Sequence, residues 1–292
     1  MQGKIVKGIG GFYYVHDGHE TLTECRARGG FRQQEIKPLV GDNVRIRLTE
    51  EDPGSGYIEE LLPRSNTLIR PAVANVDQAM ILVSLRHPAF HPGLLDRFLL
   101  WMEWQHIPVR IGISKKDLAK PGEVEEIERV YEGAGCEVCS FSALTGEGLS
   151  DLRAKLLGKT TVLAGASGVG KSTLLNHLMT RPVMETGHLS RRLERGRHTT
   201  RHSEIFCFEE NSFLCDTPGF TSLDLPPVEE EELKDCYPEF APFSRDCAFR
   251  DCLHAREPGC RVKQAVEKGQ IAGSRYESYS RFLEEFRARK KY

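Results

Sequence analysis

Eight consecutive residues, GASGVGKS from Gly165 to Ser172, have the spacing G-x-x-x-x-G-K-[ST] that binds nucleotide phosphates. The glycines let the backbone turn so that its N–H groups face phosphate oxygens. Lys171 has the reach and charge to contact β- and γ-phosphates, and the Ser172 hydroxyl suits Mg²⁺. An apolar strand, TTVLAG, precedes the loop and a helix, LLNHLM, follows it, so the helix dipole adds positive charge there. The predicted phosphate-binding residues are Gly165, Ala166, Ser167, Gly168, Val169, Gly170, Lys171, Ser172 and Thr173.

Two later segments have residues suited to contact the terminal phosphate. DTPGF, from Asp216, follows the predicted strand SFLC. A carboxylate at that place can accept a hydrogen bond from a Mg²⁺-bound water, and Gly219 can offer its N–H to the γ-phosphate. GRHTTR lies between this segment and the phosphate loop, and Thr199 or Thr200 can close over Mg²⁺ and the γ-phosphate as a mobile switch. The sequence does not decide between the two threonines.

The candidate base-recognition residues precede the phosphate loop. SKKD, from Ser114 to Asp117, follows the apolar strand VRIGI. The Asp117 carboxylate can accept from the N1–H and N2–H₂ donors of guanine, which adenine does not offer together, and the stem of Lys115 can pack on the ring. SAL, from Ser142, can supply a backbone N–H to guanine O6. The predicted guanine-binding residues are Ser114, Lys115, Lys116, Asp117, Ser142, Ala143 and Leu144.

In this chain the base motifs precede the phosphate loop and the switches, whereas in Ras-like GTPases the phosphate loop and the switches precede the base motifs. The same sheet can be opened at another loop and its former ends joined, because the termini of a domain usually lie close together on its surface. The sequence therefore predicts a circularly permuted GTPase. In this order DTPGF is the last motif of the GTPase domain, and the C-terminal region follows it directly.

Four residues near the C-terminus have the types and spacing of zinc ligands: Cys247-x4-Cys252-x-His254-x5-Cys260. Three thiolates and one imidazole can complete a tetrahedral Zn²⁺ site without an open catalytic position, which predicts one structural zinc. Cys136 and Cys139, in a probable strand with no second pair nearby, are expected to be core residues.

The arrangement of predicted elements indicates a multidomain protein. Residues 1–63 contain roughly five short strands with turn signals, which favours a small barrel of the OB type, with an SH3-like barrel as the alternative. Residues 64–226 alternate strands with helices, as expected for a central α/β P-loop GTPase domain with a largely parallel sheet. Residues 227–292 are expected to form a mostly helical zinc-binding domain.

Composition narrows the class of protein. The net charge is -2, but residues 241–292 contain 12 Lys and Arg against 7 Asp and Glu, and such local basic regions suit nucleic acid or are solvated surface. The sequence lacks an apolar run long enough to span a membrane, and MQGKIVKGIG lacks the apolar core of a signal peptide, so a cytoplasmic protein is expected. Nine cysteines without a secretion signal argue against a disulfide framework.

Together the barrel, the permuted motifs GASGVGKS, GRHTTR and DTPGF, and the C-x4-C-x-H-x5-C cluster resemble the family of ribosome small-subunit-dependent GTPases called RsgA, YjeQ or YloQ. The resemblance covers essentially the whole chain. It implies GTP hydrolysis, with Mg²⁺, stimulated by the small ribosomal subunit, a role in late maturation of that subunit, and contact with its 16S rRNA. Separately from the resemblance, the protein is expected to be a monomer without a membrane partner.

Two positions depart from the patterns usual in such GTPases. Ser114 stands where Asn or Thr usually begins the base motif, so guanine preference is expected to depend more on Asp117. Phe220 follows DTPG where Ras-like enzymes carry a water-positioning Gln, so intrinsic hydrolysis is expected to be slow. His198, in GRHTTR, is the candidate catalytic residue, because an imidazole can position or deprotonate water, or else it faces rRNA. Two alternatives are a GTP-dependent zinc-handling protein and a non-catalytic RNA-binding module that senses nucleotide.

Overall fold

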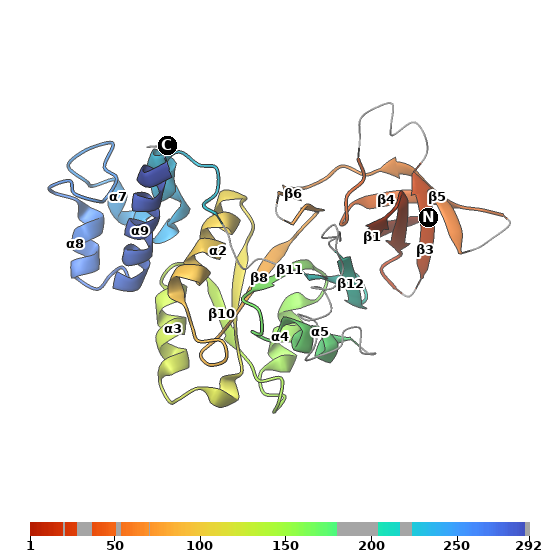
Figure 1. Ribbon diagram of the computed structural model, residues 1–292, viewed down its shortest axis with the longest axis horizontal. Helices are drawn as coiled ribbons and strands as arrows, with labels where there is room; N and C mark the ends of the chain where they lie inside the picture. The colour runs from red at the N-terminus through yellow and green to blue at the C-terminus, as the bar shows by residue number, and fades with distance from the viewer. Residues whose placement is uncertain are drawn as a thin grey trace. The chain divides into compact units, whose positions relative to one another are not determined.

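Figure 1 shows the computed structural model, coloured from the N-terminus to the C-terminus. The chain divides into two compact units. The first unit comprises Met1–Met80, Leu149–Ala164 and Gly170–Phe220, and the second comprises Ile81–Gly148, Gly165–Val169 and Thr221–Tyr292. The structure describes residues 1–19, 21–27, 37–50, 54–69, 71–179, 204–216 and 224–289. Among these residues, no helix combines the length and the apolar character needed to cross a membrane.

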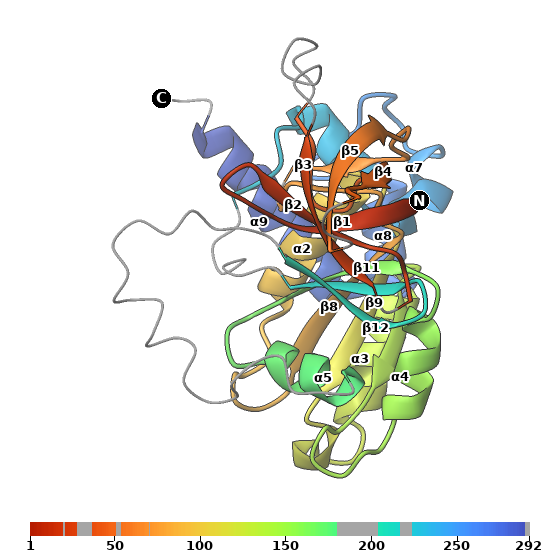
Figure 2. The ribbon, with the colours of Figure 1, turned by 90° about the vertical axis from the view of Figure 1, so that its right-hand side faces the viewer.

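The N-terminal strands close into a five-stranded barrel in the order β1-β2-β3-β5-β4 (Figure 2). The barrel strands are β1 (Gln2–Ile9), β2 (Phe12–His16), β3 (Leu22–Ala27), β4 (Asn43–Leu48) and β5 (Ser55–Leu61). Apolar residues alternate with polar ones along these strands, and the inward set packs as one core: Ile5, Val15, Cys25, Val44, Ile46 and Ile58. Gly10 and Gly11, both at positive φ, form the tight turn between β1 and β2. The expected OB-type barrel is confirmed.

The central sheet has six strands in the order β10-β9-β8-β11-β13-β12. They are β8 (Gln78–Ser84), β9 (Val109–Ser114), β10 (Glu137–Ser140), β11 (Thr160–Gly165), β12 (Glu204–Glu209) and β13 (Ser212–Asp216). β9 pairs with β10 in parallel, as β11 does with β13, whereas β12 runs antiparallel to β13. β8 and β11 are buried almost throughout, which fits the apolar runs AMILV and VLAG within them and confirms the predicted α/β domain.

Helices and short turns connect these strands. They are α2 (Pro92–Trp104), the 3₁₀ helix η1 (Lys116–Leu118), α3 (Glu123–Glu132), α4 (Leu149–Leu156) and α5 (Lys171–Leu178). The N-terminus of α2 shows why the sequence begins a helix there: His91 caps it by accepting a hydrogen bond from the Leu94 N–H at 3.2 Å, and Pro92 occupies the first helical position. A two-stranded sheet of β6 (Thr67–Leu68) and β7 (Val73–Ala74) follows the barrel strands in the chain.

The C-terminal region is mostly helical, as predicted. It consists of η3 (Glu230–Cys236), η4 (Pro238–Phe240), α7 (Ala241–Ser244), α8 (Arg261–Glu267) and α9 (Gly273–Arg289). Three aromatic rings form the centre of its core: Tyr237 stacks on Phe240 with ring centroids 5.0 Å apart, and Tyr279 meets both rings edge to face. Small domains of this size need such dense aromatic packing because they bury little surface.

A buried ionic cluster joins α9 to α2 within the second unit. Arg275 of α9 donates to Asp96 of α2 and to Glu239 of η4, both at 2.7 Å, and all three side chains are almost fully buried. Burial alone would lower the pKa of Arg275, but the charges of Asp96 and Glu239 outweigh it and raise that pKa above its ordinary value. Arg275 therefore keeps its charge, and it is the cation that lies between both carboxyl groups.

Replacing Arg275 with Met is expected to lower the free energy of unfolding by about 3–5 kcal/mol, because two buried carboxylates lose their cation. Urea denaturation of both proteins measures the difference. Arg281→Met is the matched control on the same helix, since the Arg281 side chain is 68% exposed and should change stability by less than about 0.5 kcal/mol. Equal stability of the two variants would contradict this assignment.

Candidate functional site

The predicted phosphate loop connects the end of β11 to the start of α5. Gly165 closes β11 with a φ of 138°, and a Cβ there would lie 2.3 Å from the carbonyl oxygen of Leu82, so no other residue fits without a shift of the backbone. Gly168 and Gly170 also have positive φ, and α5 begins at Lys171 directly after Gly170. The loop therefore has the strand–turn–helix setting that lets N–H groups surround a phosphate.

Lys171 and Asp216 interact electrostatically in the first unit. Burial lowers the pKa of Lys171, and the negative charge of Asp216 opposes that shift. Asp216 ends β13 and lies opposite Leu163 of β11 in the parallel register, which places this first residue of DTPGF next to the strand that leads into the phosphate loop. Ser172 and Thr173 lie half-buried in the first turn of α5. These positions suit phosphate and Mg²⁺ ligands.

Lys115 connects the base-recognition segment to the phosphate loop. It follows the last residue of β9 and takes a left-handed conformation with φ of 55°. Its Nζ donates to the carbonyl oxygen of Gly168 at 2.9 Å and also to that of His87. The Lys115 stem therefore extends from the base segment to the phosphate loop, and this orientation allows its methylene groups to pack against a base.

Ser114 makes a second connection to the same loop. Its hydroxyl lies 2.6 Å from the carbonyl oxygen of Val169 and 3.0 Å from that of Val83, and the residue is only 2% exposed. A hydroxyl can donate one hydrogen bond at a time, so the two carbonyl groups share this donor. The structure thus gives Ser114 a backbone-anchoring contact, whereas the sequence suggested a weakened contact with the base.

The two base-recognition segments meet at Asp117 and Ser142. The Ser142 hydroxyl donates to Asp117 Oδ1 at 2.5 Å and accepts from the Thr145 N–H at 3.2 Å. Ser142 is fully buried, whereas Leu144 is 85% exposed, so the SAL backbone emerges at the surface beside the Asp117 carboxylate. One Asp117 oxygen is held by Ser142, and this hydrogen bond restricts the orientation of the carboxylate.

The remaining predicted residues divide into placed and unplaced positions. Lys116 pairs with Glu147 at 2.7 Å, and Ala143 is half-buried. The positions outside the described residues are His198, Thr199, Thr200 and Gly219. The sequence analysis missed Glu147, although its place between two glycines after SALT was a turn signal. It also missed His87, which contributes a backbone carbonyl, and a backbone group cannot be recognised from the type of the residue.

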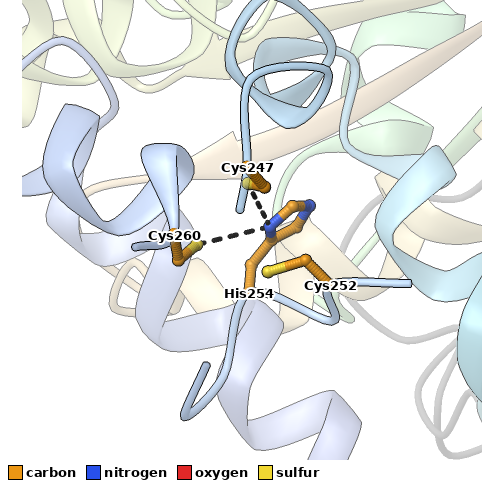
Figure 3. Close-up of side chains that lie close together, drawn as sticks. All are labelled: Cys247, Cys252, His254 and Cys260. Atoms are coloured by element: carbon orange, nitrogen blue, oxygen red, sulfur yellow. Dashed lines mark hydrogen bonds between the residues drawn. The ribbon is translucent and has the colours of Figure 1, made fainter. Parts of the chain in front are cut away.

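The four predicted metal ligands converge (Figure 3). The ligand atoms of Cys247, Cys252, His254 and Cys260 all lie within 4.8 Å of one another. His254 Nδ1 is 3.6 Å from the sulfur of Cys247 and 3.4 Å from that of Cys260. Ligands of a tetrahedral Zn²⁺ with bonds of about 2.0–2.3 Å stand about 3.3–3.8 Å apart, so these distances fit zinc.

Neighbouring groups hold the histidine of this cluster. Ser244 Oγ lies 3.1 Å from His254 Nε2, and the Tyr276 hydroxyl donates to the His254 carbonyl oxygen at 2.6 Å. His254 is almost fully buried, and its Nδ1 is the nitrogen that faces the sulfurs. Such support of the second ring nitrogen fixes ring orientation in metal sites. The cluster can therefore hold a metal ion with four protein ligands.

Cys136 and Cys139 lie apart from this cluster, as predicted, but they are not fully in the core. Neither thiol is part of a disulfide, both residues are half-buried, and Cys139 belongs to β10, which lies at one edge of the six-stranded sheet. The apolar sequence around them indicated a strand correctly, but it could not show that the strand lies at an edge.

Ser114→Ala is expected to weaken the binding of GTP and GDP by a similar factor of roughly ten, because a buried carbonyl loses its donor and the phosphate loop loses an anchor. Titration with fluorescent nucleotide analogues measures both affinities. The preference for GTP over XTP should stay unchanged, since the hydroxyl faces backbone carbonyls. Ser150→Ala, at an exposed position on α4, is the control. A selective loss of guanine preference would contradict the anchoring role.

Comparison with known proteins is consistent with this geometry. The RsgA N-terminal domain matches residues 2–58, and the RsgA GTPase domain matches residues 61–226. A relative from Agathobacter rectalis named Small ribosomal subunit biogenesis GTPase RsgA is 48% identical, with all of both chains covered. A relative of the same name from Alkaliphilus metalliredigens is 45% identical over all of this chain and 99% of its own length.

Two solved structures share the fold over nearly the whole chain. YloQ, described as a circularly permuted GTPase, is 37% identical with a TM-score of 0.80, covering 99% of this chain and 95% of that one. YjeQ from Thermotoga maritima is 37% identical with a TM-score of 0.81, covering 98% of both chains. With the motif order and the joined base and phosphate loops, these matches show that the chain belongs to the RsgA family of circularly permuted GTPases.

Proposed function

We propose that this protein hydrolyses GTP to GDP and phosphate in the late maturation of the small ribosomal subunit, and that the subunit stimulates the reaction. The observation that carries the nucleotide part is the connection of Ser114 and Lys115 to the phosphate loop, beside the Asp117–Ser142 pair. The ribosomal part is supported by family membership and by the names of the relatives from Agathobacter rectalis and Alkaliphilus metalliredigens.

In the proposed complex, guanine N1–H and N2–H₂ donate to Asp117, and a backbone N–H of the SAL segment donates to O6. The remaining members of the two base segments are Ser114, Lys115, Lys116, Ser142, Ala143 and Leu144. The residues of the phosphate loop and of α5 that surround the phosphates are Gly165, Ala166, Ser167, Gly168, Val169, Gly170, Lys171, Ser172 and Thr173. The half-buried Lys171 supports this assignment, because partial exclusion of water strengthens its attraction to phosphate.

Mg²⁺ is proposed to accompany GTP, where it neutralises phosphate charge during hydrolysis. Ser172 would hold it directly, and Asp216 would accept a hydrogen bond from one of its waters. Thr199 or Thr200, together with Gly219, would complete the contacts at the γ-phosphate. His198 is proposed to position the attacking water, because Phe220 offers no group that can do so.

Zinc is proposed as a structural ion on Cys247, Cys252, His254 and Cys260. The support is the donor set, its distances and its burial: Cys252, His254 and Cys260 are nearly inaccessible. A site closed by four protein ligands suits stabilisation of a small domain better than exchange of the metal, which disfavours the zinc-handling alternative.

The domains are proposed to be 1–63 for the barrel, 64–226 for the GTPase domain and 227–292 for the zinc-binding domain. The proposed partners are the small subunit and its 16S rRNA, and the protein is proposed to act as a cytoplasmic monomer. Barrel topology supports contact with RNA, since OB barrels commonly bind oligonucleotides.

Purified protein is expected to contain one zinc per chain by inductively coupled plasma mass spectrometry. The double variant Cys252→Ser with Cys260→Ser should lose the metal and unfold the C-terminal region, because metal binding provides folding free energy there, while GTP affinity stays within about twofold. Cys139→Ser, which changes a thiol outside the cluster, should keep full metal content. Absence of zinc from protein prepared without chelator would disprove the proposal.

Small subunits are expected to accelerate GTP turnover by about two orders of magnitude or more, whereas large subunits and free rRNA should not. The variant Asp117→Asn should lose GTP affinity by roughly 10- to 150-fold, because a hydrogen bond to a charged acceptor is lost, and should prefer XTP. Small subunits should then stimulate its XTP turnover, which ties the stimulated reaction to this site. Turnover that small subunits do not change would overturn the ribosomal role. The GTP and XTP affinities of Asp117→Asn would still test whether Asp117 recognises guanine.

A further inference from the structure

Four strands lie next to one another in the barrel in the order β2-β3-β5-β4 (Figure 2), and one row of paired residues crosses them. Phe12 of β2 pairs with Arg26 of β3, Arg26 pairs with Tyr57 of β5, and Tyr57 pairs with Arg47 of β4. The row therefore alternates an aromatic ring with a guanidinium group, one per strand. We refer to Phe12, Arg26, Tyr57 and Arg47 as the outer row.

The outer row faces solvent because its chain neighbours face the core. Cys25, Ile46 and Ile58 belong to the buried core of the barrel, so the residues next to them point outward. Tyr57 is 41% exposed, and the Arg47 side chain is 65% exposed. These two groups are accessible to a ligand in the described structure.

The first half of the row already shows the stacking that these groups favour. The guanidinium of Arg26 lies over the ring of Phe12, 4.5 Å from its centroid. Tyr57 lies on the other side of Arg26 in the register, so its position on β5 is flanked by Arg26 of β3 and Arg47 of β4. Nucleobases stack on both aromatic rings and guanidinium planes, so the row offers successive flat surfaces of one kind.

The charges near the row favour bases over phosphates as the recognised groups. Glu59 lies 3.5 Å from Arg47, and Glu60 pairs with Arg45 at 2.7 Å. These glutamates partly neutralise the arginines and leave no concentrated positive patch along β4 and β5. A surface that binds through the phosphate backbone alone would need uncompensated cations.

We propose that the outer row is a platform for unpaired nucleobases of a single-stranded RNA segment. The choice of RNA rests on the proposed function, whereas the choice of unpaired bases rests on the row itself, since paired bases keep their faces inside a helix. Neighbouring strands lie about 4.8 Å apart, so the four residues span about 14 Å, which is room for two or three splayed bases.

Binding to a fluorescein-labelled ten-nucleotide single-stranded RNA, followed by anisotropy on the full-length protein, tests the proposal. Tyr57→Ala should weaken binding roughly 5- to 150-fold, and Tyr57→Leu should weaken it similarly, because both lose the ring. Tyr57→Phe should keep wild-type affinity. Leu22→Ala is the control, since Leu22 is 53% exposed on β3 but offers no ring. Thermal unfolding verifies that each variant is folded.

The same RNA annealed to its complement separates base stacking from phosphate contact. Affinity for the duplex should be equal in wild type and Tyr57→Ala. Equal losses for the duplex and the single strand, or full single-strand affinity in Tyr57→Ala, would overturn the proposal. Failure of the wild-type protein to bind the single strand would overturn it as well.

Turnover assays distinguish this inference from the proposed function. Tyr57→Ala should keep the GTP hydrolysis rate of the isolated protein and should need a higher concentration of small subunits for half-maximal stimulation. A wild-type protein that small subunits fail to stimulate would refute the proposed function, while the oligonucleotide affinities would still decide the assignment of the outer row.

Discussion

The contacts of Ser114 and Lys115 with the phosphate loop are the constraint on which the nucleotide site depends. Two carbonyl groups of one loop, those of Gly168 and Val169, receive donors from the segment that recognises the base. The loop and that segment lie about fifty residues apart in the chain. They meet because β9 and β11, which precede them, belong to the same sheet. The permuted motif order is compatible with these contacts. They require the two segments to be neighbours in space, whichever of the two comes first in the chain.

Permutation changes what the ends of the GTPase fold are attached to. The chain now leaves the sheet after β13 and continues into the C-terminal helices, which the buried Arg275–Asp96–Glu239 cluster fixes to α2. α2 follows the loop that contains His87, whose carbonyl accepts from Lys115. The C-terminal helices are therefore fixed to the helix that follows this loop in the chain.

The N-terminal barrel and the C-terminal region are both small, and different interactions stabilise their cores. The barrel closes its strands on one another, so that six apolar side chains form a core without an exposed sheet edge. The C-terminal region instead combines stacked aromatic rings with four converging metal-ligand side chains. On the outer face of the barrel, aromatic residues alternate with arginines in the strand register.

The sequence alone determined features that follow from local chemistry. The sequence predicted three sites, from the motifs GASGVGKS, SKKD with SAL, and the Cys/His spacing. Such predictions are possible because glycine positions, donor types and ligand spacing depend on residues close together in the chain. Only the tertiary structure decided which groups meet across long separations. It directed the Ser114 hydroxyl to Val169, buried Arg275 against Asp96, and aligned Phe12, Arg26, Tyr57 and Arg47 in one row. Register and burial depend on how whole strands and helices pack, and no local pattern encodes them.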